Sequence, residues 1–283
     1  MARPIPRWQL VASLAIVGLS VLATALGLLR PEHYRDADAL VTNYRVQDAT
    51  ILLVGVPALA AGLYATVRGS LRGRIVWLGA LAFMAYIWFS VVVQVSFNDA
   101  FFAYLVLFAL SLWTFVAALL DTDHEPVHDA VTGRIDARRY GLGLVLVGLA
   151  LAALWLSELV PAALAGTVPV LVQETGPQAL FSHVLDLAVV VPALVVVGVW
   201  LRRERPMAAL LAGVLFVMGT LLAAPISAMT LAIAAGDGIT LTPLAAALSF
   251  APVVVVAGLA VAYLRAMRPG DARPAREGRP PVA

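Results

Sequence analysis

Residues 176–205 read GPQALFSHVLDLAVVVPALVVVGVWLRRER, an apolar segment with a polar pair near its start and arginines at its end. A transmembrane helix needs about 20 mainly apolar residues, so this segment is long enough to cross a bilayer. His183 and Asp186 lie one helical turn apart within it. Ionisable side chains are costly in hydrocarbon and usually serve a function there, so the pair is a candidate functional site.

The composition of the whole chain indicates a membrane protein. Of its 283 residues, 62% are hydrophobic and 13% are charged, whereas soluble domains are about half apolar and about a quarter charged. The net charge is +2, but the arginines stand beside apolar segments, as expected of membrane topology. We therefore expect the lipid bilayer as a partner and no nucleic acid.

Two residue types are missing from the chain, and each absence excludes a chemistry. There is no cysteine, which excludes disulfides, thiolate nucleophiles and an iron–sulfur cluster. There is also no lysine, which excludes a retinal Schiff base and the Walker lysine of P-loop ATPases. A divalent metal bound by histidine and carboxylates stays open as a cofactor.

Hydropathy predicts an all-α fold, a polytopic transmembrane bundle of about eight helices. The first span, preceded by Arg3 and Arg7, also resembles a secretory signal, although we expect a retained helix. The predicted spans are 8–29, 48–68, 75–95, 101–120, 139–158, 178–201, 206–235 and 242–265.

The arginines predict that both termini lie in the cytoplasm. They cluster in alternate connections and at both ends of the chain, and only Arg30, Arg35 and Arg45 fall on the other side. Because cytoplasmic loops are enriched in Lys and Arg, the arginine-rich connections are assigned to the inside. His183 and Asp186 then lie toward the outer face.

The pattern also suggests two halves. We expect a first four-helix half at 1–120, a charged cytoplasmic loop at 121–138, a second four-helix half at 139–268 and a disordered tail at 269–283. VGVPAL at 54–59 is similar to VVVPAL at 189–194, and Asp48 precedes the first as Asp186 precedes the second. This suggests a parallel internal repeat of four plus four helices, with one gap because the Asp-to-Pro spacing differs.

Polar residues gather in the outer parts of the predicted spans and predict an outward-facing polar pocket. The chief candidates are His183, Asp186 and Glu158, which suit either a proton relay or a divalent metal. A histidine hydrogen-bonded for purely structural reasons is an equal alternative. For Asp48 we expect a salt bridge with Arg45 more than a binding role. For Gln94 we expect hydrogen bonding between helices.

Four segments carry a resemblance: 77–89, 97–112, 155–162 and 183–206. With WLGALAFMAYIWF, FNDAFFAYLVLFALSL, WLSELVPA and HVLDLAVVVPALVVVGVWLRRERP, the chain resembles a group of uncharacterised bacterial multi-pass membrane proteins over about residues 41–205. The resemblance implies the bacterial plasma membrane as location. It implies no activity or ligand.

Three functions fit these observations. The first is binding or transport of a small molecule or ion on the outer face, favoured by the suspected repeat and by Pro225, which is expected to interrupt the seventh span. The second is a membrane-embedded enzyme that acts on a lipid-like substrate, with His183 as base or metal ligand. The third is an accessory or sensory subunit.

Overall fold

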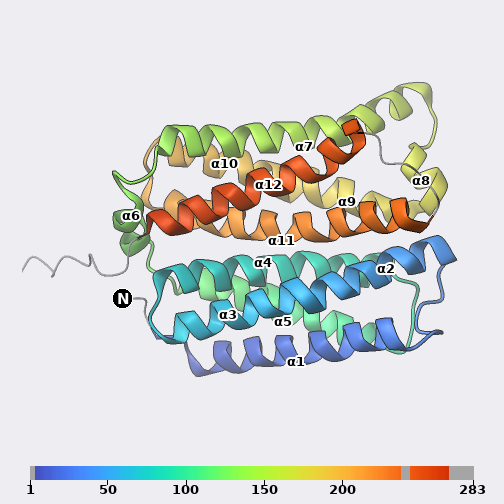
Figure 1. Cartoon of the computed structure of the whole chain (residues 1–283), viewed down its shortest axis with the longest axis horizontal. Helices are drawn as coiled ribbons and strands as arrows, with labels where there is room; N and C mark the ends of the chain where they lie inside the picture. Colours follow the sequence, from blue (N-terminus) through green and yellow to red (C-terminus); the bar gives the residue numbers. More distant parts are fainter. Residues whose placement is uncertain (1–3, 237–242, 268–283) are drawn as a thin grey trace, which may run out of the picture.

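The computed structural model describes residues 4–236 and 243–267, and these residues form helices and connections without a strand (Figure 1). The predicted all-α helix bundle is therefore confirmed. The predicted disordered tail, 269–283, lies outside the described residues.

The helices follow the predicted spans closely. Seven helical segments are long and apolar enough to cross a membrane, and α12 adds the shorter apolar stretch Val253–Ala266, which is consistent with about eight spans. The long helices are α1 (Arg7–Leu29), α4 (Leu71–Gln94), α5 (Phe101–Leu120), α7 (Ala137–Ala165), α11 (Pro206–Gly236) and α12 (Pro243–Ala266). The shorter ones are α2 (Asp38–Thr50), α3 (Val56–Val67), α6 (Glu125–Val131), α8 (Val170–Thr175), α9 (Leu180–Leu185) and α10 (Val191–Arg202).

Two π-helical turns interrupt the second and sixth spans. They are η1 (Ile51–Gly55), between α2 and α3, and η3 (Asp186–Val190), between α9 and α10. Each turn is followed by Val-Pro, and the N–H of that valine donates to the carbonyl five residues earlier. Val56 donates to Ile51, and Val191 donates to Asp186. A helical proline lacks an N–H and clashes with the carbonyl one turn back, which a widened turn relieves. The interruption expected at Pro225 is absent, because α11 continues through it.

The bundle has two ends of different character. One end holds α6 and the starts of α1, α4, α7 and α11 (Figure 1). It carries most of the arginines and is called the arginine-rich end below. The opposite end holds the connection 30–37, the turn 95–100 and the segment 166–179 with α8. Helices α1–α5 form one group and α7–α12 the other, and α4 packs against α11 between them.

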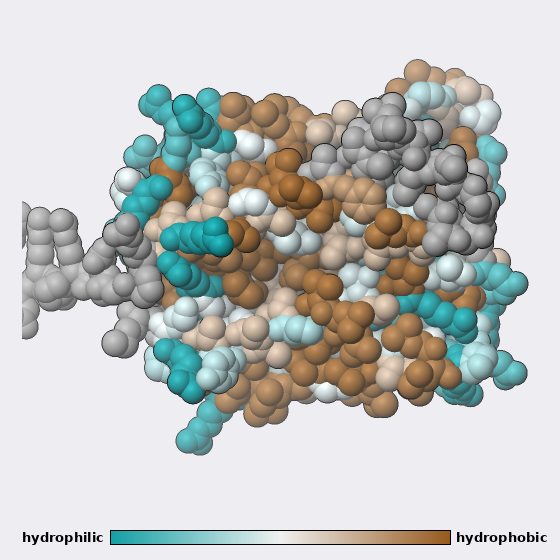
Figure 2. All heavy atoms as spheres, in the orientation of Figure 1, coloured by the Kyte–Doolittle hydropathy of each residue, from teal (hydrophilic) through white to brown (hydrophobic). Residues whose placement is uncertain are grey.

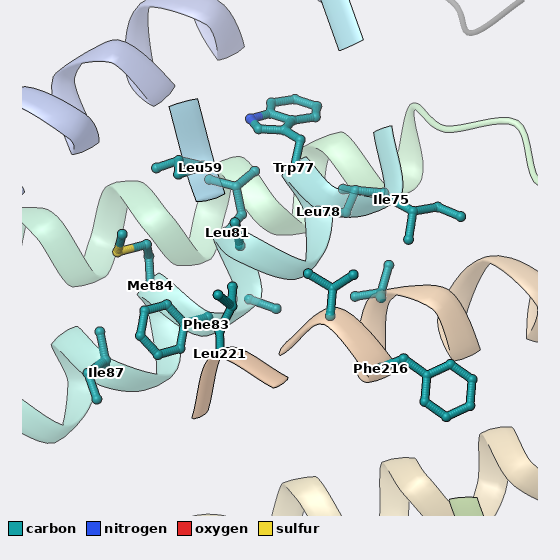
Figure 3. Close-up of a cluster of buried hydrophobic side chains, with 14 of the residues drawn as sticks. Leu59, Ile75, Trp77, Leu78, Leu81, Phe83, Met84, Ile87, Phe216 and Leu221 are labelled. Carbon is teal, nitrogen blue, oxygen red and sulfur yellow. The ribbon is translucent and has the colours of Figure 1, made fainter. Parts of the chain in front are cut away.

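Helix α4 is the core of the molecule. Its side chains include the fully buried Trp77, Trp88, Leu78 and Leu81, and Figure 3 shows several of them packed together. Both indole N–H groups donate to serines of α1, Trp77 to Ser13 at 3.1 Å and Trp88 to Ser20 at 3.2 Å. A buried indole N–H needs a partner, so these two bonds fix the register of α1 against α4.

The exterior is apolar between polar ends (Figure 2). Large side chains such as Leu22, Trp113 and Leu164 are exposed there. In the most apolar stretch of α7, only 11% of the residues are buried inside the bundle. Apolar surface on this scale would be costly in water but is matched by lipid. The protein is thus an integral membrane helix bundle.

Candidate functional site

The structure brings His183 and Glu158 together at the opposite end of the bundle. His183, on α9, is 1% exposed, and its Nε2 lies 3.4 Å from Glu158 Oε2 on α7. Its Nδ1 lies 3.2 Å from the carbonyl oxygen of Ala179. The Trp155 ring packs against the imidazole, with ring centroids 4.3 Å apart.

The contacts that form hydrogen bonds depend on the protons of the His183 ring. A carbonyl only accepts hydrogen bonds, so Nδ1 bonds to Ala179 only when it carries a hydrogen. Nε2 then bonds to the Glu158 carboxyl only if one more proton lies between them, as imidazolium and carboxylate or as imidazole and carboxylic acid. The other carboxyl oxygen, Oε1, accepts the Leu171 N–H at 2.8 Å. Both ring contacts are hydrogen bonds at the same time only when the pair holds one proton more than a neutral ring and a carboxylate.

Asp186 lies beside this pair but has different partners. Tyr86 donates its hydroxyl to Oδ1 and Trp155 donates its indole N–H to Oδ2, both at 2.9 Å. Asp186 is therefore not hydrogen bonded to His183, and Glu158 contacts the ring instead. Tyr86 belongs to α4 and Asp186 to η3, so this carboxyl joins the two helix groups.

The proposed metal set gains no support from this geometry. Among the described residues, no three His, Cys, Asp or Glu side chains are placed to hold a metal ion. Asp186 is occupied by Tyr86 and Trp155, while His183 and Glu158 supply two groups where a metal would need three or more protein ligands.

Asp48 belongs to a second polar cluster, in the first half of the chain. Its side chain is 3% exposed, and the Tyr34 hydroxyl donates to Oδ2 at 2.5 Å. The expected salt bridge with Arg45 does not form, since the Arg45 Nη2 donates to the Pro31 carbonyl at 3.1 Å. The reason is that Arg45 reaches along the connection 30–37, whereas Asp48 points toward α1.

Gln94 contacts another helix through its backbone, while its side chain bonds within its own helix α4. Its side-chain Oε1 accepts the Ser90 hydroxyl at 2.7 Å, and its backbone carbonyl accepts the Tyr44 hydroxyl at 3.1 Å. Tyr44 is on α2 and Gln94 ends α4, so the contact links two helices. The five candidate residues are thus divided between a His183 cluster, an Asp48 cluster and a helix bridge.

The donors to the two aspartates were missed in the sequence. Tyr34, Tyr86 and Trp155 satisfy the buried carboxyls, yet aromatic residues are common in membrane helices, so their presence alone does not mark them as donors. The available signal was chemical, because a buried carboxyl needs hydrogen-bond donors and these side chains supply them.

A cavity of about 340 Å³ lies at the arginine-rich end, away from these residues. Its walls come from the residues around α6, the start of α7 and the connection from α10 to α11. At the opposite end, the polar side chains described above pack on one another. An outward-facing pocket accordingly stays a prediction.

Gly27 is the contact point between α1 and the Asp48 cluster. A Cβ there would lie 1.9 Å from Asp48 Oδ2 and 2.7 Å from the Tyr34 hydroxyl. We expect Gly27→Ala to push the carboxyl away and to lower the unfolding free energy by about 1–3 kcal/mol. Thermal unfolding in detergent measures this, with loss of the Tyr34 contact visible by infrared spectroscopy of the carboxyl. Unchanged stability together with an unchanged carboxyl spectrum would contradict it.

No protein-family model, curated relative or solved structure matches this chain.

Proposed function

We propose that this protein binds or transports a small molecule or ion at the end opposite the arginines, and that the His183–Glu158 pair exchanges its proton when it does so. The single observation that carries the proposal is the contact between the buried His183 ring and the Glu158 carboxyl, three residues before the π turn η3. π turns inside α-helices are frequent at functional sites. By the arginine distribution, the site faces outward from a bacterial plasma membrane.

Coupling to the rest of the bundle supports a transport reading. Trp155 contacts His183 through its ring and Asp186 through its N–H, and Asp186 accepts from Tyr86 of the other helix group. A change of charge at His183 is therefore next to a contact that holds the two groups together. Transporters commonly move two such bundles against each other around a central site.

A parallel repeat of the two halves is also part of this proposal. The two halves have three corresponding element starts. These are Ile51 and Asp186 for the π turns, Val56 and Val191 for the helices that follow, and Leu71 and Pro206 for the next long helices. Each pair is separated by the same number of residues, so no gap is needed across these elements. The same separation pairs Asp48 with His183 and not with Asp186. Both halves thus have a polar group at the same place before the π turn.

A membrane enzyme is less well supported. His183 would be its base, but the ring is 1% exposed and both nitrogens are occupied by Ala179 and Glu158. A substrate would have to displace Glu158 to reach it. A sensory subunit would use the same proton and differs only in needing a partner protein.

The proton in the pair should be visible through Trp155. The fluorescence of Trp155 is measured as the part of the signal that is lost in Trp155→Phe. Because an imidazolium quenches a neighbouring indole more than an imidazole does, we expect this fluorescence to change with pH in one step. The step should vanish in His183→Gln and move in Glu158→Gln. The control is His128→Gln, on α6 at the other end, which should leave it unchanged. A pH-independent Trp155 signal would refute the shared proton.

Binding itself is tested by native mass spectrometry of the purified protein. The proposal expects a retained small molecule or ion in the wild type, lost in Glu158→Gln and kept in the control His128→Gln. Adding the retained species back should shift the pH step of Trp155. If the wild type carries nothing, or if Glu158→Gln retains the same species, the proposal fails.

A further inference from the structure

The cavity at the arginine-rich end is separate from His183 and has the dimensions of a ligand site. Its volume of about 340 Å³ falls within the range of small-molecule sites, roughly 300–1,000 Å³. It lies between the connection from α6 to α7 and the connection from α10 to α11. Val131, Ile135 and Leu201 give it apolar walls. The arginine distribution predicts that this end faces the cytoplasm.

The charged side chains on the wall of this cavity differ in their partners. The Asp136 carboxyl accepts the Arg139 backbone N–H at 3.1 Å and pairs with its Nε at 3.0 Å. The side chains of Arg138, Glu204 and Arg205 form no hydrogen bond or ion pair with the rest of the described chain. Two guanidinium groups and one carboxylate at the cavity are therefore available to a ligand.

Glu204 has a backbone conformation that favours glycine. Its φ is 55°, and no other non-glycine residue in 4–236 and 243–267 has a positive φ. Helix α10 ends here in a Schellman motif, in which the Arg205 N–H donates to the Trp200 carbonyl at 3.1 Å and the Glu204 N–H to the Leu201 carbonyl at 2.9 Å. Glycine is usual at this position because a Cβ is costly in the left-handed region. A glutamate held there at this cost points to a use for its carboxylate.

The Arg205 guanidinium is oriented by an aromatic ring. Its Cζ lies 5.4 Å from the centroid of the Trp200 ring, a cation–π contact. Such a contact restricts the side chain without taking up a carboxylate or carbonyl acceptor. Arg205 is thus held at the cavity with its charge uncompensated by an ion pair.

An exposed apolar face leads away from the cavity along α7. Leu142, Leu146 and Leu149 follow Arg138 at helical spacing, so the four side chains lie along one face of the helix. The three leucines are exposed at the outside of the bundle. An acyl chain lying on this face would bring its phosphate to Arg138.

We propose that this cavity binds the phosphoethanolamine headgroup of a zwitterionic phospholipid of the cytoplasmic leaflet. Arg138 and Arg205 bind the phosphate, because a guanidinium presents paired N–H donors to its oxygens. The Glu204 carboxylate accepts from the ammonium group, which an anionic headgroup without an amine would leave unpaired. The acyl chains lie against the leucines of α7. Basic pockets between transmembrane helices on the cytoplasmic side are known to bind lipid headgroups.

This lipid site goes beyond the proposed function and does not rest on it. It lies at the other end of the bundle from His183 and Glu158 and uses neither residue. Glu158→Gln should therefore leave lipid binding at the cavity unchanged, whatever it does to the ligand at the opposite end.

Native mass spectrometry of the purified full chain in detergent tests the lipid site. The protein is titrated with phosphatidylethanolamine or with phosphatidylglycerol of the same short acyl chains, which has the phosphate but no amine. We expect phosphatidylethanolamine to bind roughly 10-fold more tightly, because it adds one charge-assisted contact. Free phosphoethanolamine at the same concentration should not displace the lipid, since it lacks the acyl chains.

Substitutions separate the two parts of the headgroup. Arg138→Gln and Arg205→Gln should weaken both lipids roughly 10-fold, whereas Glu204→Gln should weaken phosphatidylethanolamine alone. The matched control is Arg203→Gln, which makes the same charge change next to Glu204 but off the cavity wall, and it should bind both lipids as the wild type does.

Glu204→Gly gives an arm that a folding defect cannot explain. It should raise the unfolding temperature in lipid-free detergent, because glycine suits the positive φ, and yet lose the preference for phosphatidylethanolamine. The proposal is overturned if the wild type binds the two lipids equally, if the Glu204 variants keep the preference, or if Arg203→Gln weakens binding as much as Arg138→Gln. Displacement by an equal concentration of free phosphoethanolamine would overturn the assignment to a lipid.

Discussion

Gly62→Ala is expected to cost about 3 kcal/mol of stability. Gly62 lies where α3 meets α4, and an added Cβ would be 2.6 Å from the Trp77 backbone nitrogen and 2.8 Å from its Cα. Backbone atoms have no rotamer to change, so the two helices must move apart. Trp77 would then be pulled from Ser13.

The control for this prediction is Gly18→Ala, on the exposed face of α1. No atom lies within 4 Å of a Cβ at that position, so the change should be neutral or stabilising by up to about 1 kcal/mol. The stability of both variants is measured by circular dichroism as the concentration of a denaturing detergent is raised. Equal stability of the two would show that α3 and α4 are not packed as closely as described.

Asp186→Ala is the second large effect, with an expected loss of about 3 kcal/mol. The substitution leaves the Tyr86 hydroxyl and the Trp155 N–H without their acceptor inside the bundle. Each orphaned buried donor costs about 1–3 kcal/mol, and the contact between the two helix groups is lost as well.

A double substitution distinguishes this cause from a loss of packing. Adding Tyr86→Phe to Asp186→Ala removes one orphaned donor, so the double variant should be more stable than Asp186→Ala alone. The fluorescence of Trp155 should shift in both, since its N–H has lost Asp186. If the second substitution only adds to the damage, the hydrogen bond is not what holds Asp186 in place.

Much of the fold was predictable because membrane helices are determined by local properties. The length of each apolar segment and its arginine flanks gave the spans, and most helix ends of the structure agree with them within a few residues. The exceptions are α2, which begins at Asp38 instead of residue 48, and α7, which continues to Ala165 instead of ending at residue 158. The π turns were not predicted, although Pro57 and Pro192 marked both places. A proline in an apolar segment is compatible with a kink, a break or a widened turn, and Pro225 shows that it can also leave the helix continuous.

The sequence by itself determined that this is an all-α membrane bundle with its buried carboxyls and His183 toward one end, because hydropathy and charge act through position along the chain. Only the tertiary structure decided the partners. Asp186 meets Tyr86, 100 residues away, and His183 meets Glu158 and not Asp186. Such pairs depend on how each helix is rotated against its neighbours, and that rotation is set by close packing such as Gly27 against Asp48 and Gly62 against Trp77. His183 and Asp186, three residues apart, therefore serve different contacts: His183 meets Glu158 of α7, and Asp186 joins the two helix groups through Tyr86.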